Sequence, residues 1–323
     1  MKKRVVLLVL IIASQLVAGQ ARYESLLRAR ALSERGESEE ALAVLTTVIS
    51  DMPDAVLLLL RGDIWLELKN VAQARGDFMA AENLEQGAGL FGLAKCAAAT
   101  GDALAATSYL EAHLKTPFRK SEPEIMLDDA FSSIVSSPEW RSLWKKDWYT
   151  VSEEKISEIE FYASGGKIEE ASAVLNDLKK SYPGSVTTKY AESLVDISAG
   201  RFTSAVRTLS ELLASEPDNE KYLRTLSRAQ EKLDNPAGAS VSYSKLLSLG
   251  VPDADILKLR AECYRRTGET DKAIADIEKY LNLYPDDRKA LSLAGKLNAS
   301  SGDNLKALKY FSDNLKNNPN DPQ

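Results

Sequence analysis

A repeat of about 34 residues runs through this 323-residue chain and constrains its fold more than any other feature. One alanine returns at intervals of 33, 32, 65, 34, 34, 34 and 34 residues, at Ala41, Ala74, Ala106, Ala171, Ala205, Ala239, Ala273 and Ala307. A large apolar residue follows each alanine by four positions, at Leu45, Phe78, Leu110, Leu175, Leu209, Tyr243, Ile277 and Phe311. Such self-similarity is typical of stacked supersecondary units, so it predicts a repeat protein.

Turn and packing signals stand at fixed distances from this alanine. Glycine precedes it by five positions where a left-handed backbone can end a helix, at Gly36, Gly101, Gly166, Gly200, Gly268 and Gly302. Proline follows it by twelve positions where it stops a helix, at Pro53, Pro183, Pro217, Pro285 and Pro319. A small residue precedes it by twelve and lets two helices approach, at Ala29, Gly62, Ala94, Ala261 and Gly295. Each unit therefore predicts a helix, a tight turn and a second helix.

These residues and spacings resemble the tetratricopeptide repeat family over nearly all of the chain after residue 21. The clearest unit combines Leu257, Ala261, Tyr264, Gly268, Ala273, Ile277, Tyr280 and Pro285. The family register gives units at 22–55, 55–88, 87–120, 152–185, 186–219, 220–253, 254–287 and 288–321. Departures are Ile159, Ser193 and Ser227 at the small position and Asp234 at the turn glycine. The resemblance implies an all-α fold, a right-handed superhelical α-solenoid of stacked helix-turn-helix repeats.

The 65-residue interval predicts two arrays, 22–120 with three units and 152–321 with five. The segment 121–151 between them lacks the pattern and resembles the helical segment that often closes a tetratricopeptide array. It contains Trp140, Trp144 and Trp148, four residues apart, after a helix start at Ser137 and Pro138. This spacing predicts one helical stripe of indoles. The stripe either seals the apolar end of the first array or forms a platform for a sugar or a partner protein.

Residues 1–21 have the pattern of a secretory signal peptide. Lys2, Lys3 and Arg4 precede an apolar run over 5–13, and small residues follow at Ala18, Gly19 and Ala21. The run is shorter than the roughly 20 residues that span a bilayer, so we expect no stable membrane insertion after cleavage. No cysteine lies near this site to take a lipid anchor. We therefore expect an exported bacterial protein, periplasmic or secreted.

The residue composition argues against a catalytic function for this chain. One histidine, His113, and two cysteines, Cys96 and Cys263, leave little material for a metal site or a general base. The sequence has no phosphate-binding glycine loop, H-E-x-x-H, C-x-x-C or G-x-S-x-G motif. We expect His113 to be a satisfied, half-buried imidazole and the cysteines to be buried small hydrophobes. The prediction is therefore no enzyme, no cofactor, no metal and no nucleic-acid partner; an enzyme built from scattered carboxylates has no supporting feature.

The resemblance also suggests where a partner binds. In the family, first-helix positions 2, 5, 9, 12 and 13 line the concave groove. In units six to eight they hold three acids, Glu231, Asp255 and Glu262, and nine cations, namely Lys221, Arg224, Arg228, Lys232, Lys258, Arg265, Arg266, Lys289 and Lys296. In units one to three they hold mainly apolar residues, namely Tyr23, Leu26, Val56, Leu59, Leu66, Ala88 and Phe91. The family's carboxylate clamp is not supported, because position 9 holds Arg228, Glu262 and Lys296 instead of asparagine.

The groove charge runs against the charge of the whole chain. The chain has net charge −6, and removal of Lys2, Lys3 and Arg4 makes it −9. A face of +6 on such a chain predicts an acidic segment, a carboxylate terminus or an anionic polymer as ligand. The alternative is a solvated face that nearby acids balance, namely Glu220, Asp253 and Glu269.

Together these features predict a non-enzymatic interaction scaffold or assembly factor of the cell envelope. It would bind an extended or acidic segment of a partner protein or peptide in the concave groove. The alternative is a glycan-binding or peptidoglycan-binding protein that uses Trp140, Trp144 and Trp148. The last unit ends at Pro319 without a visible capping helix. Either its second helix provides the polar face that a terminal repeat needs, or a partner or a second copy covers that end; the polar residues are Asn304, Lys306, Lys309, Asp313 and Lys316.

Overall fold

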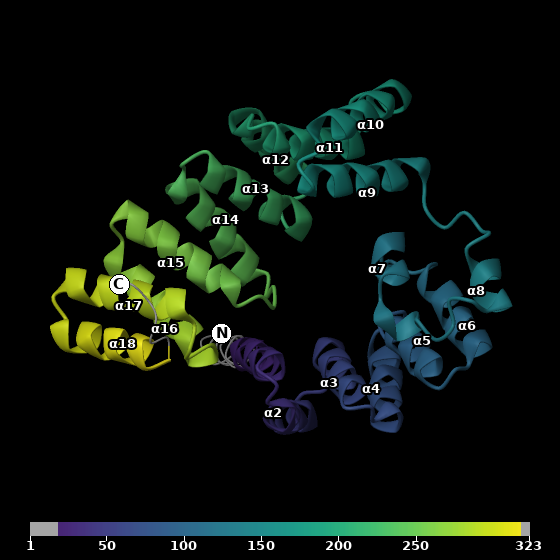
Figure 1. The fold of residues 1–323 in the computed structure, drawn as a ribbon, viewed down its shortest axis with the longest axis horizontal. Coiled ribbons are helices and arrows are strands. Elements are labelled where there is room, and N and C mark those ends of the chain that lie inside the picture. The colour runs from purple at the N-terminus through teal and green to yellow at the C-terminus, as the bar shows by residue number, and fades with distance from the viewer. Residues whose placement is uncertain (1–18, 318–323) are drawn as a thin grey trace, which may run out of the picture. The chain divides into compact units, whose positions relative to one another are not determined.

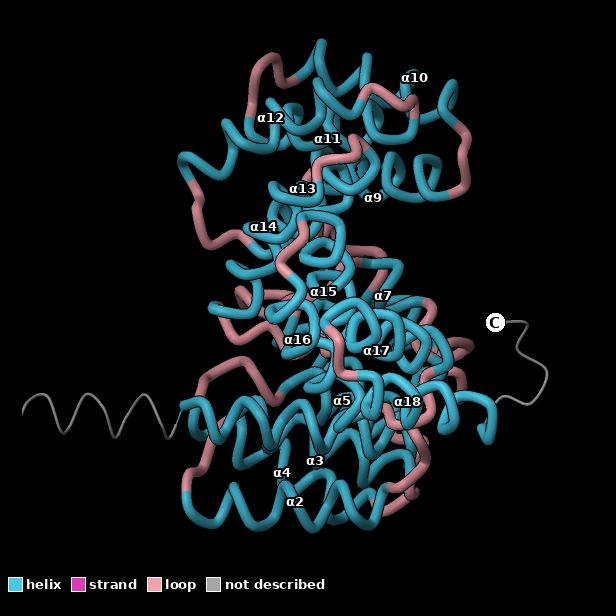
Figure 2. The backbone as a smooth tube through the Cα atoms, turned by 90° about the vertical axis from the view of Figure 1, so that its left-hand side faces the viewer, coloured by secondary structure: helices cyan, strands magenta, loops and turns pink. Residues whose placement is uncertain are grey.

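The computed structural model describes residues 19–317, which form helices joined by turns, with no strand among them (Figure 2). The predicted all-α solenoid is confirmed. The chain divides into two compact units, unit 1 up to Thr150 and unit 2 from Val151 onward. Most of the predicted signal peptide, residues 1–18, and Pro319 lie outside the described residues. No helix within 19–317 has the length and apolar character needed to cross a bilayer.

Unit 1 contains three helix pairs and a closing segment (Figure 1). The pairs are a helix over 19–34 with α2 (Ser38–Asp51), α3 (Ala55–Glu67) with α4 (Val71–Leu84), and α5 (Leu90–Ala99) with α6 (Ala103–His113). The closing segment contains α7 (Glu122–Met126), the 3₁₀ turn η1 (Asp129–Phe131) and α8 (Pro138–Leu143). Both η1 and α8 contact the third pair, so this segment covers the end of the stack.

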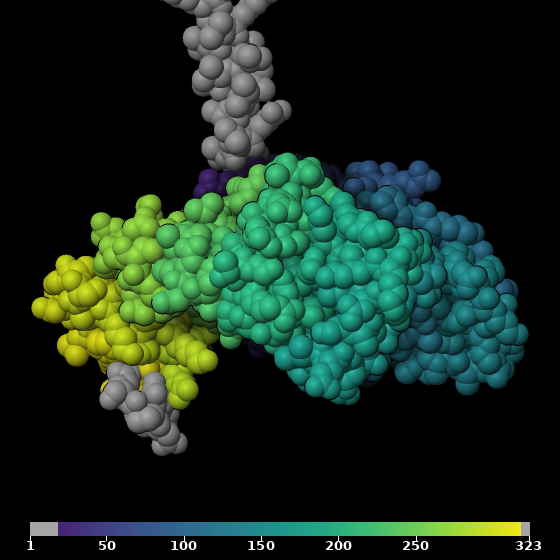
Figure 3. All heavy atoms as spheres, turned by 90° about the horizontal axis from the view of Figure 1, so that it is seen from above, coloured from purple at the N-terminus to yellow at the C-terminus, as the bar shows by residue number. Residues whose placement is uncertain are grey.

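Unit 2 contains five helix pairs that stack in chain order. The surface colour in Figure 3 accordingly runs from teal to yellow along this unit. They are α9 (Val151–Ser164) with α10 (Ile168–Ser181), α11 (Val186–Ser198) with α12 (Phe202–Ser215), α13 (Glu220–Lys232) with α14 (Pro236–Ser248), α15 (Asp255–Thr267) with α16 (Thr270–Leu283), and α17 (Arg288–Ser301) with α18 (Asn304–Asn317). Each pair packs against the next, so apolar side chains that one pair leaves open are covered by its neighbour.

The first helices of unit 2 lie on the inner side of its curve. Helix α9 contacts α11, α11 contacts α13, and α15 contacts α17, whereas second helices of successive pairs share no contact of similar extent within the described residues. Elements on the inside of a bend are closer together than those on the outside. The first helices therefore form the concave face of unit 2.

The turn signals act as predicted. All six turn glycines have left-handed backbone, with φ between 71° and 88°, at Gly36, Gly101, Gly166, Gly200, Gly268 and Gly302. The helix before each of the four described prolines ends two residues earlier, at Asp51, Ser181, Ser215 and Leu283. In two units Lys69 and Asp234 take the glycine position, and each has a φ of 60°. These two turns keep the repeat geometry without the residue that suits it best.

Close helix approach explains the small residues. A Cβ atom added to Gly62 would lie 2.7 Å from the ring of Phe78, and one added to Gly92 would lie 2.3 Å from it. The ring therefore fills space that two glycines leave. At the departures, Ser193 and Ser227 are buried, and each hydroxyl donates to the carbonyl oxygen three residues earlier. Serine fits there because its one polar group is satisfied within its own helix.

The closing segment differs from its prediction in one respect. Helix α8 begins as expected, because the Ser137 Oγ accepts a hydrogen bond from the Trp140 N–H at 3.1 Å. It ends at Leu143, so the predicted helical stripe of three tryptophans is wrong. The chain turns back, and the Trp148 Nε1 donates to the Leu143 carbonyl oxygen at 2.8 Å. A hydrogen bond to the end of α8 thus replaces another helical turn.

Candidate functional site

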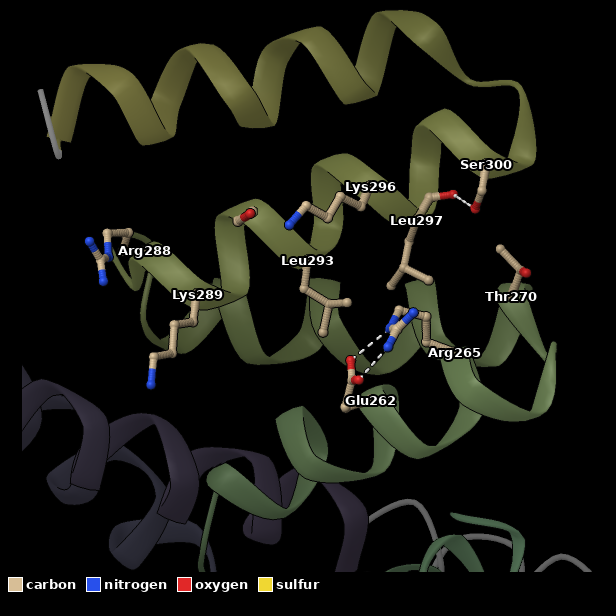
Figure 4. Close-up of a pocket in the computed structure, with 10 residues that line it drawn as sticks. Glu262, Arg265, Thr270, Arg288, Lys289, Leu293, Lys296, Leu297 and Ser300 are labelled. Atoms are coloured by element: carbon tan, nitrogen blue, oxygen red, sulfur yellow. Dashed lines mark hydrogen bonds and ion pairs between the residues drawn. The ribbon is translucent and has the colours of Figure 1, made fainter. Parts of the chain in front are cut away.

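A pocket of about 740 Å³ opens on the concave face of unit 2, between α15, α17 and the start of α16. Its lining residues are Glu262, Arg265, Thr270, Arg288, Lys289, Ser292, Leu293, Lys296, Leu297 and Ser300. Figure 4 shows Leu293 and Leu297 pointing from α17 toward Arg265 and Glu262 on α15. The pocket is thus formed by two successive helix pairs.

The pocket is strongly positive. Four cations line it, Arg265, Arg288, Lys289 and Lys296, against one acid, Glu262. Lys289 and Lys296 are exposed, and neither forms an ion pair with another residue in 19–317. Two apolar side chains lie beside these charges. Such a lining suits an anionic group attached to an apolar one.

Arg265 is held in place by its own helix. Its Nε and Nη2 atoms donate to the two carboxylate oxygens of Glu262 at 2.8 and 2.6 Å. These hydrogen bonds raise the pKa of Arg265, although burial opposes the effect. Because the two residues are three positions apart on α15, the pair fixes the guanidinium at the pocket wall.

Lys258, a predicted groove residue, is already occupied. Its Nζ donates to the Tyr280 hydroxyl at 2.9 Å and to the Asp287 carboxylate at 3.0 Å. Burial opposes the charged form, but these hydrogen bonds raise the pKa of Lys258 above its ordinary value. Asp287 also caps α17 by accepting from the Ala290 N–H. Lys258 therefore ties α15 to the start of the next pair and offers little to a ligand.

Other predicted cations are paired as well. Lys221 forms an ion pair with Glu160 at 2.8 Å. Arg224 forms two ion pairs, with Glu220 and Asp253, at 2.7 Å each. Burial opposes the charged form of Arg224, but these hydrogen bonds raise its pKa. The acids that the balanced-face alternative named thus neutralise part of the stripe.

The nine predicted cations therefore divide into three groups. Those that line the pocket are Arg265, Lys289 and Lys296. Those tied into ion pairs elsewhere are Lys221, Arg224, Lys258 and Arg266, the last with Asp234. Those exposed on α13 without an ion pair in the described part of the chain are Arg228 and Lys232. Arg288 was missed because it precedes the first of the five family positions in its unit.

Unit 1 has a pocket of opposite charge between its first helices and the closing segment. It measures about 750 Å³ and is lined by Arg30, Ser33, Glu34, Leu60, Asp63, Leu66, Glu67, Lys69, Lys95, Asp128, Asp129 and Ala130. Five acids outnumber three cations, and Lys95 pairs with Asp63 at 2.6 Å. Of the apolar residues predicted for this groove, Leu26 and Ala88 are each only 8% exposed, whereas Val56 is 44% exposed. The apolar prediction therefore holds at some of these positions, and acids line the pocket beside them.

The tryptophans do not form an open row. Trp140 is 4% exposed and packs against Phe131, with ring centroids 5.5 Å apart. The Trp148 ring lies beside the Lys115 and Lys146 ammonium groups, 5.9 and 5.5 Å from its centroid. Trp140 thus contributes its area to the core of unit 1, as the sealing interpretation expects, and presents no free face to a sugar.

His113 is more buried than predicted and only partly satisfied. It is 2% exposed, and its Nε2 accepts from the Lys120 N–H at 3.1 Å. Its Nδ1 has no hydrogen-bond partner among residues 19–317, and the ring packs on Phe91. Burial, and secondarily the charge of Lys120, lowers the pKa of His113 to about 4. The neutral imidazole is therefore the folded form at neutral pH.

The cysteines are buried and free, as predicted. Burial raises the pKa of the Cys96 thiol to about 11 and that of Cys263 to about 12. Thiols of this kind react slowly, because the thiolate is the nucleophile. Within residues 19–317, no group of three or more histidine, cysteine, aspartate or glutamate side chains has the arrangement of a metal site.

Comparison with known proteins agrees with the repeat architecture. Residues 26–88 and 259–287 each match the tetratricopeptide repeat, one match in each unit. DnaJ homolog subfamily C member 3 of Gallus gallus is 26% identical over 172 residues, which cover 48% of this chain. The match covers 34% of that relative, so the chain spans about a third of its length.

Solved structures of MamA are also similar. One is 20% identical, with a TM-score of 0.45, and covers 51% of this chain and 91% of its own. MamA from Desulfovibrio magneticus RS-1 is 16% identical, with a TM-score of 0.47, and covers 53% of this chain and 97% of its own. Residues 26–88 and 259–287 are thus similar to the tetratricopeptide repeat, and the eight helix pairs within residues 19–317 have the same helix-turn-helix architecture.

Proposed function

We propose that this chain is a non-enzymatic interaction scaffold that holds an acidic segment of a partner protein on the concave face of unit 2. The observation that supports this most is the pocket between α15 and α17, where four cations surround a single acid. Because the chain as a whole has net charge −6, this pocket opposes the general charge of the protein. Such a focused potential recruits and orients an anionic ligand.

The ligand contains carboxylates beside an apolar side chain. Lys289 and Lys296 supply the exposed charges, and Leu293 with Leu297 supplies an apolar wall. An extended segment with glutamate or aspartate next to leucine matches both. Stacked helices with a curved inner face suit extended ligands.

The protein acts outside the cytoplasm in this proposal, as an assembly factor of the bacterial cell envelope. The support is the sequence over 1–21, in which three cations precede a short apolar run and small residues. Cell fractionation followed by N-terminal sequencing tests it. The mature chain should begin after Ala18, Gly19 or Ala21, and an intact Met1 in the cytoplasmic fraction would contradict export.

A peptide titration tests the groove. The probe is a fluorescent peptide of alternating glutamate and leucine, and its partner has glutamine in place of glutamate. The glutamate peptide should bind with an affinity that falls as salt rises. Replacing Lys289 and Lys296 with alanine should weaken binding about tenfold or more, because hydrogen bonds to charged groups contribute about 1.5–3 kcal/mol each.

Matched variants distinguish binding at this pocket from a general effect of the protein's positive charges. Lys180→Ala with Lys279→Ala removes the same charge from exposed positions on second helices and should leave binding unchanged. The Lys258→Ala variant should weaken binding less than Lys296→Ala, since Lys258 is already occupied. Equal binding of the glutamine peptide, or equal loss in the second-helix control, would contradict the proposal.

A further inference from the structure

The last helix of the described chain exposes an apolar stripe. On α18, Leu305, Leu308 and Leu315 are 84%, 68% and 50% exposed. Their spacing of three and seven residues places them on one side of the helix. The opposite side, with Ala307 and Asn314, is buried. The stripe therefore points away from the rest of the stack.

The positions of Leu308 and Leu315 are covered in the preceding pair. Leu281 and Ile274 of α16 stand 34 residues before Leu315 and Leu308, and they are buried and half-buried respectively. Helix α16 packs against α17, the first helix of the following pair. Leu213 of α12, also in this register, packs into the core that α13 and α14 form. Helix α18 thus exposes the side chains with which α16 packs against the next pair. Within residues 19–317 no following helix covers them.

The first helix of unit 2, α9, exposes the surface that would receive such a second helix. Phe161 on α9 is 66% exposed. The later first helices have residues no more than 2% exposed at this position, namely Val195, Ala229, Cys263 and Leu297. In three of these cases the residue shares a core with the second helix of the preceding pair. Phe161 therefore stands where a preceding second helix would pack.

The charges around the two faces are complementary. Lys309 and Lys316 lie beside the leucine stripe of α18, one position after Leu308 and Leu315. Glu154 and Glu158 lie seven and three residues before Phe161 on the same side of α9. Neither these glutamates nor Lys316 forms an ion pair with another described residue. Pairing α18 with a second α18 would bring four lysines together, which charge repulsion opposes.

We propose that the α18 face of one copy docks on the α9 face of a second copy and repeats the contact that α16 makes with α17. The contact is heterologous, because it joins two different surfaces, so it leaves one face of each kind open at the ends of a dimer. It extends the array of unit 2 from copy to copy. It does not involve the cationic pocket, so it stands apart from the proposed ligand site.

Sedimentation of the purified chain over a range of concentrations tests this assembly. The wild-type mass should rise with concentration through dimers to longer species. Leu308→Glu and Phe161→Glu should each be monomeric, because each loses one face. An equal mixture of the two should form dimers and nothing larger, since one variant keeps only its α9 face and the other only its α18 face. Circular dichroism confirms that each variant folds.

Control variants distinguish this contact from non-specific hydrophobic association. Leu104→Glu changes a leucine on α6 with the same 68% exposure as Leu308 and should associate as wild type does. The double variant Lys309→Glu with Lys316→Glu should be monomeric, and adding Glu154→Lys with Glu158→Lys to that chain should restore association. A wild-type chain that is monomeric throughout, normal association of Phe161→Glu, or a mixture that stays monomeric would overturn the proposal.

Discussion

The two units end in different ways although both consist of the same helix pair. At the end of unit 1, a closing segment buries Phe131, Trp140 and Leu143 to 4% exposure or less. At the end of unit 2, α18 leaves Leu308 and Leu315 at least half exposed. A terminal pair has no neighbour on its outer side, so that side needs either a polar surface or a covering segment. Unit 1 has one, and the described part of unit 2 does not.

The grooves differ as well. The pocket of unit 1 has five acids and three cations, while that of unit 2 has one acid and four cations. The charged residues that line the two pockets differ, whereas Ala41 and Ala273 at the same buried position are both alanine. The common repeat therefore fixes packing, and charge is set unit by unit.

The largest difference between the units is expected when one side chain at the end of each unit is shortened to alanine. Trp140→Ala should destabilise unit 1 by about 3–5 kcal/mol, because it leaves a cavity in the closing core. Leu308→Ala should change stability by less than about 0.5 kcal/mol, because the side chain is exposed. All four tryptophans are in unit 1, so denaturation followed by their fluorescence reports that unit, and circular dichroism reports both. Equal effects would remove the distinction between a closed and an open end.

Two ion pairs at equivalent positions, one in each unit, test whether the two units unfold independently. Arg61 makes two hydrogen bonds to Asp77, at 2.8 and 2.6 Å, and Arg260 makes two to Asp276, at 2.7 and 2.8 Å. Asp77→Ala and Asp276→Ala should each cost about 3 kcal/mol, because each strands a mostly buried guanidinium. Only Asp77→Ala should shift the tryptophan transition. If both variants shift it equally, the two units unfold together.

Acid should destabilise unit 1 selectively. The pKa of His113 is lowered to about 4 in the folded chain, against about 6.5 when unfolded. Between these values the unfolded chain binds the extra proton, so stability is full above pH 6.5 and is lost progressively toward pH 4. The loss should be on the order of 3 kcal/mol in the tryptophan transition. His113→Gln should abolish this part of the pH dependence, and an unchanged profile would contradict the assignment.

The smallest effects are expected at the two turns without glycine. Lys69→Gly in unit 1 and Asp234→Gly in unit 2 should each stabilise the chain by roughly 0.5 kcal/mol, because glycine adopts the left-handed φ of 60° without strain. Gly200→Ala is the reverse control and should destabilise by about 1 kcal/mol. The gain should be smaller at Asp234, which also loses an exposed pair with Arg266. Melting temperatures measured side by side give the order.

The helices and turns were predictable because their signals are local. Pro53 stops α2 by removing a backbone donor, and Gly268 ends α15 in a conformation that few other residues adopt. These effects depend on neighbours in sequence and hold in every unit. The prediction for the three tryptophans was wrong for the opposite reason. Their spacing suits a helix, but Trp148 bonds to the end of α8, and this tertiary contact overrides the local pattern.

The candidate site was predictable only in part. Lys258 and Lys296 both occupy groove positions of the repeat, yet one is tied to Asp287 and the other is exposed. Asp287 lies 29 residues after Lys258 and comes close only when the next pair stacks. Position in the repeat thus predicts which face a side chain occupies. It does not predict which partner that side chain finds across the stack.

The ring of Phe78 links the evolution of three positions. It touches the space above Gly62 in its own pair and above Gly92 in the next, and neither glycine can gain even a methyl group while the ring stays. An alanine at either site would therefore require the Phe78 ring to shift or to be replaced by a smaller residue. Substitutions at these three positions are therefore coupled across two neighbouring helix pairs of unit 1.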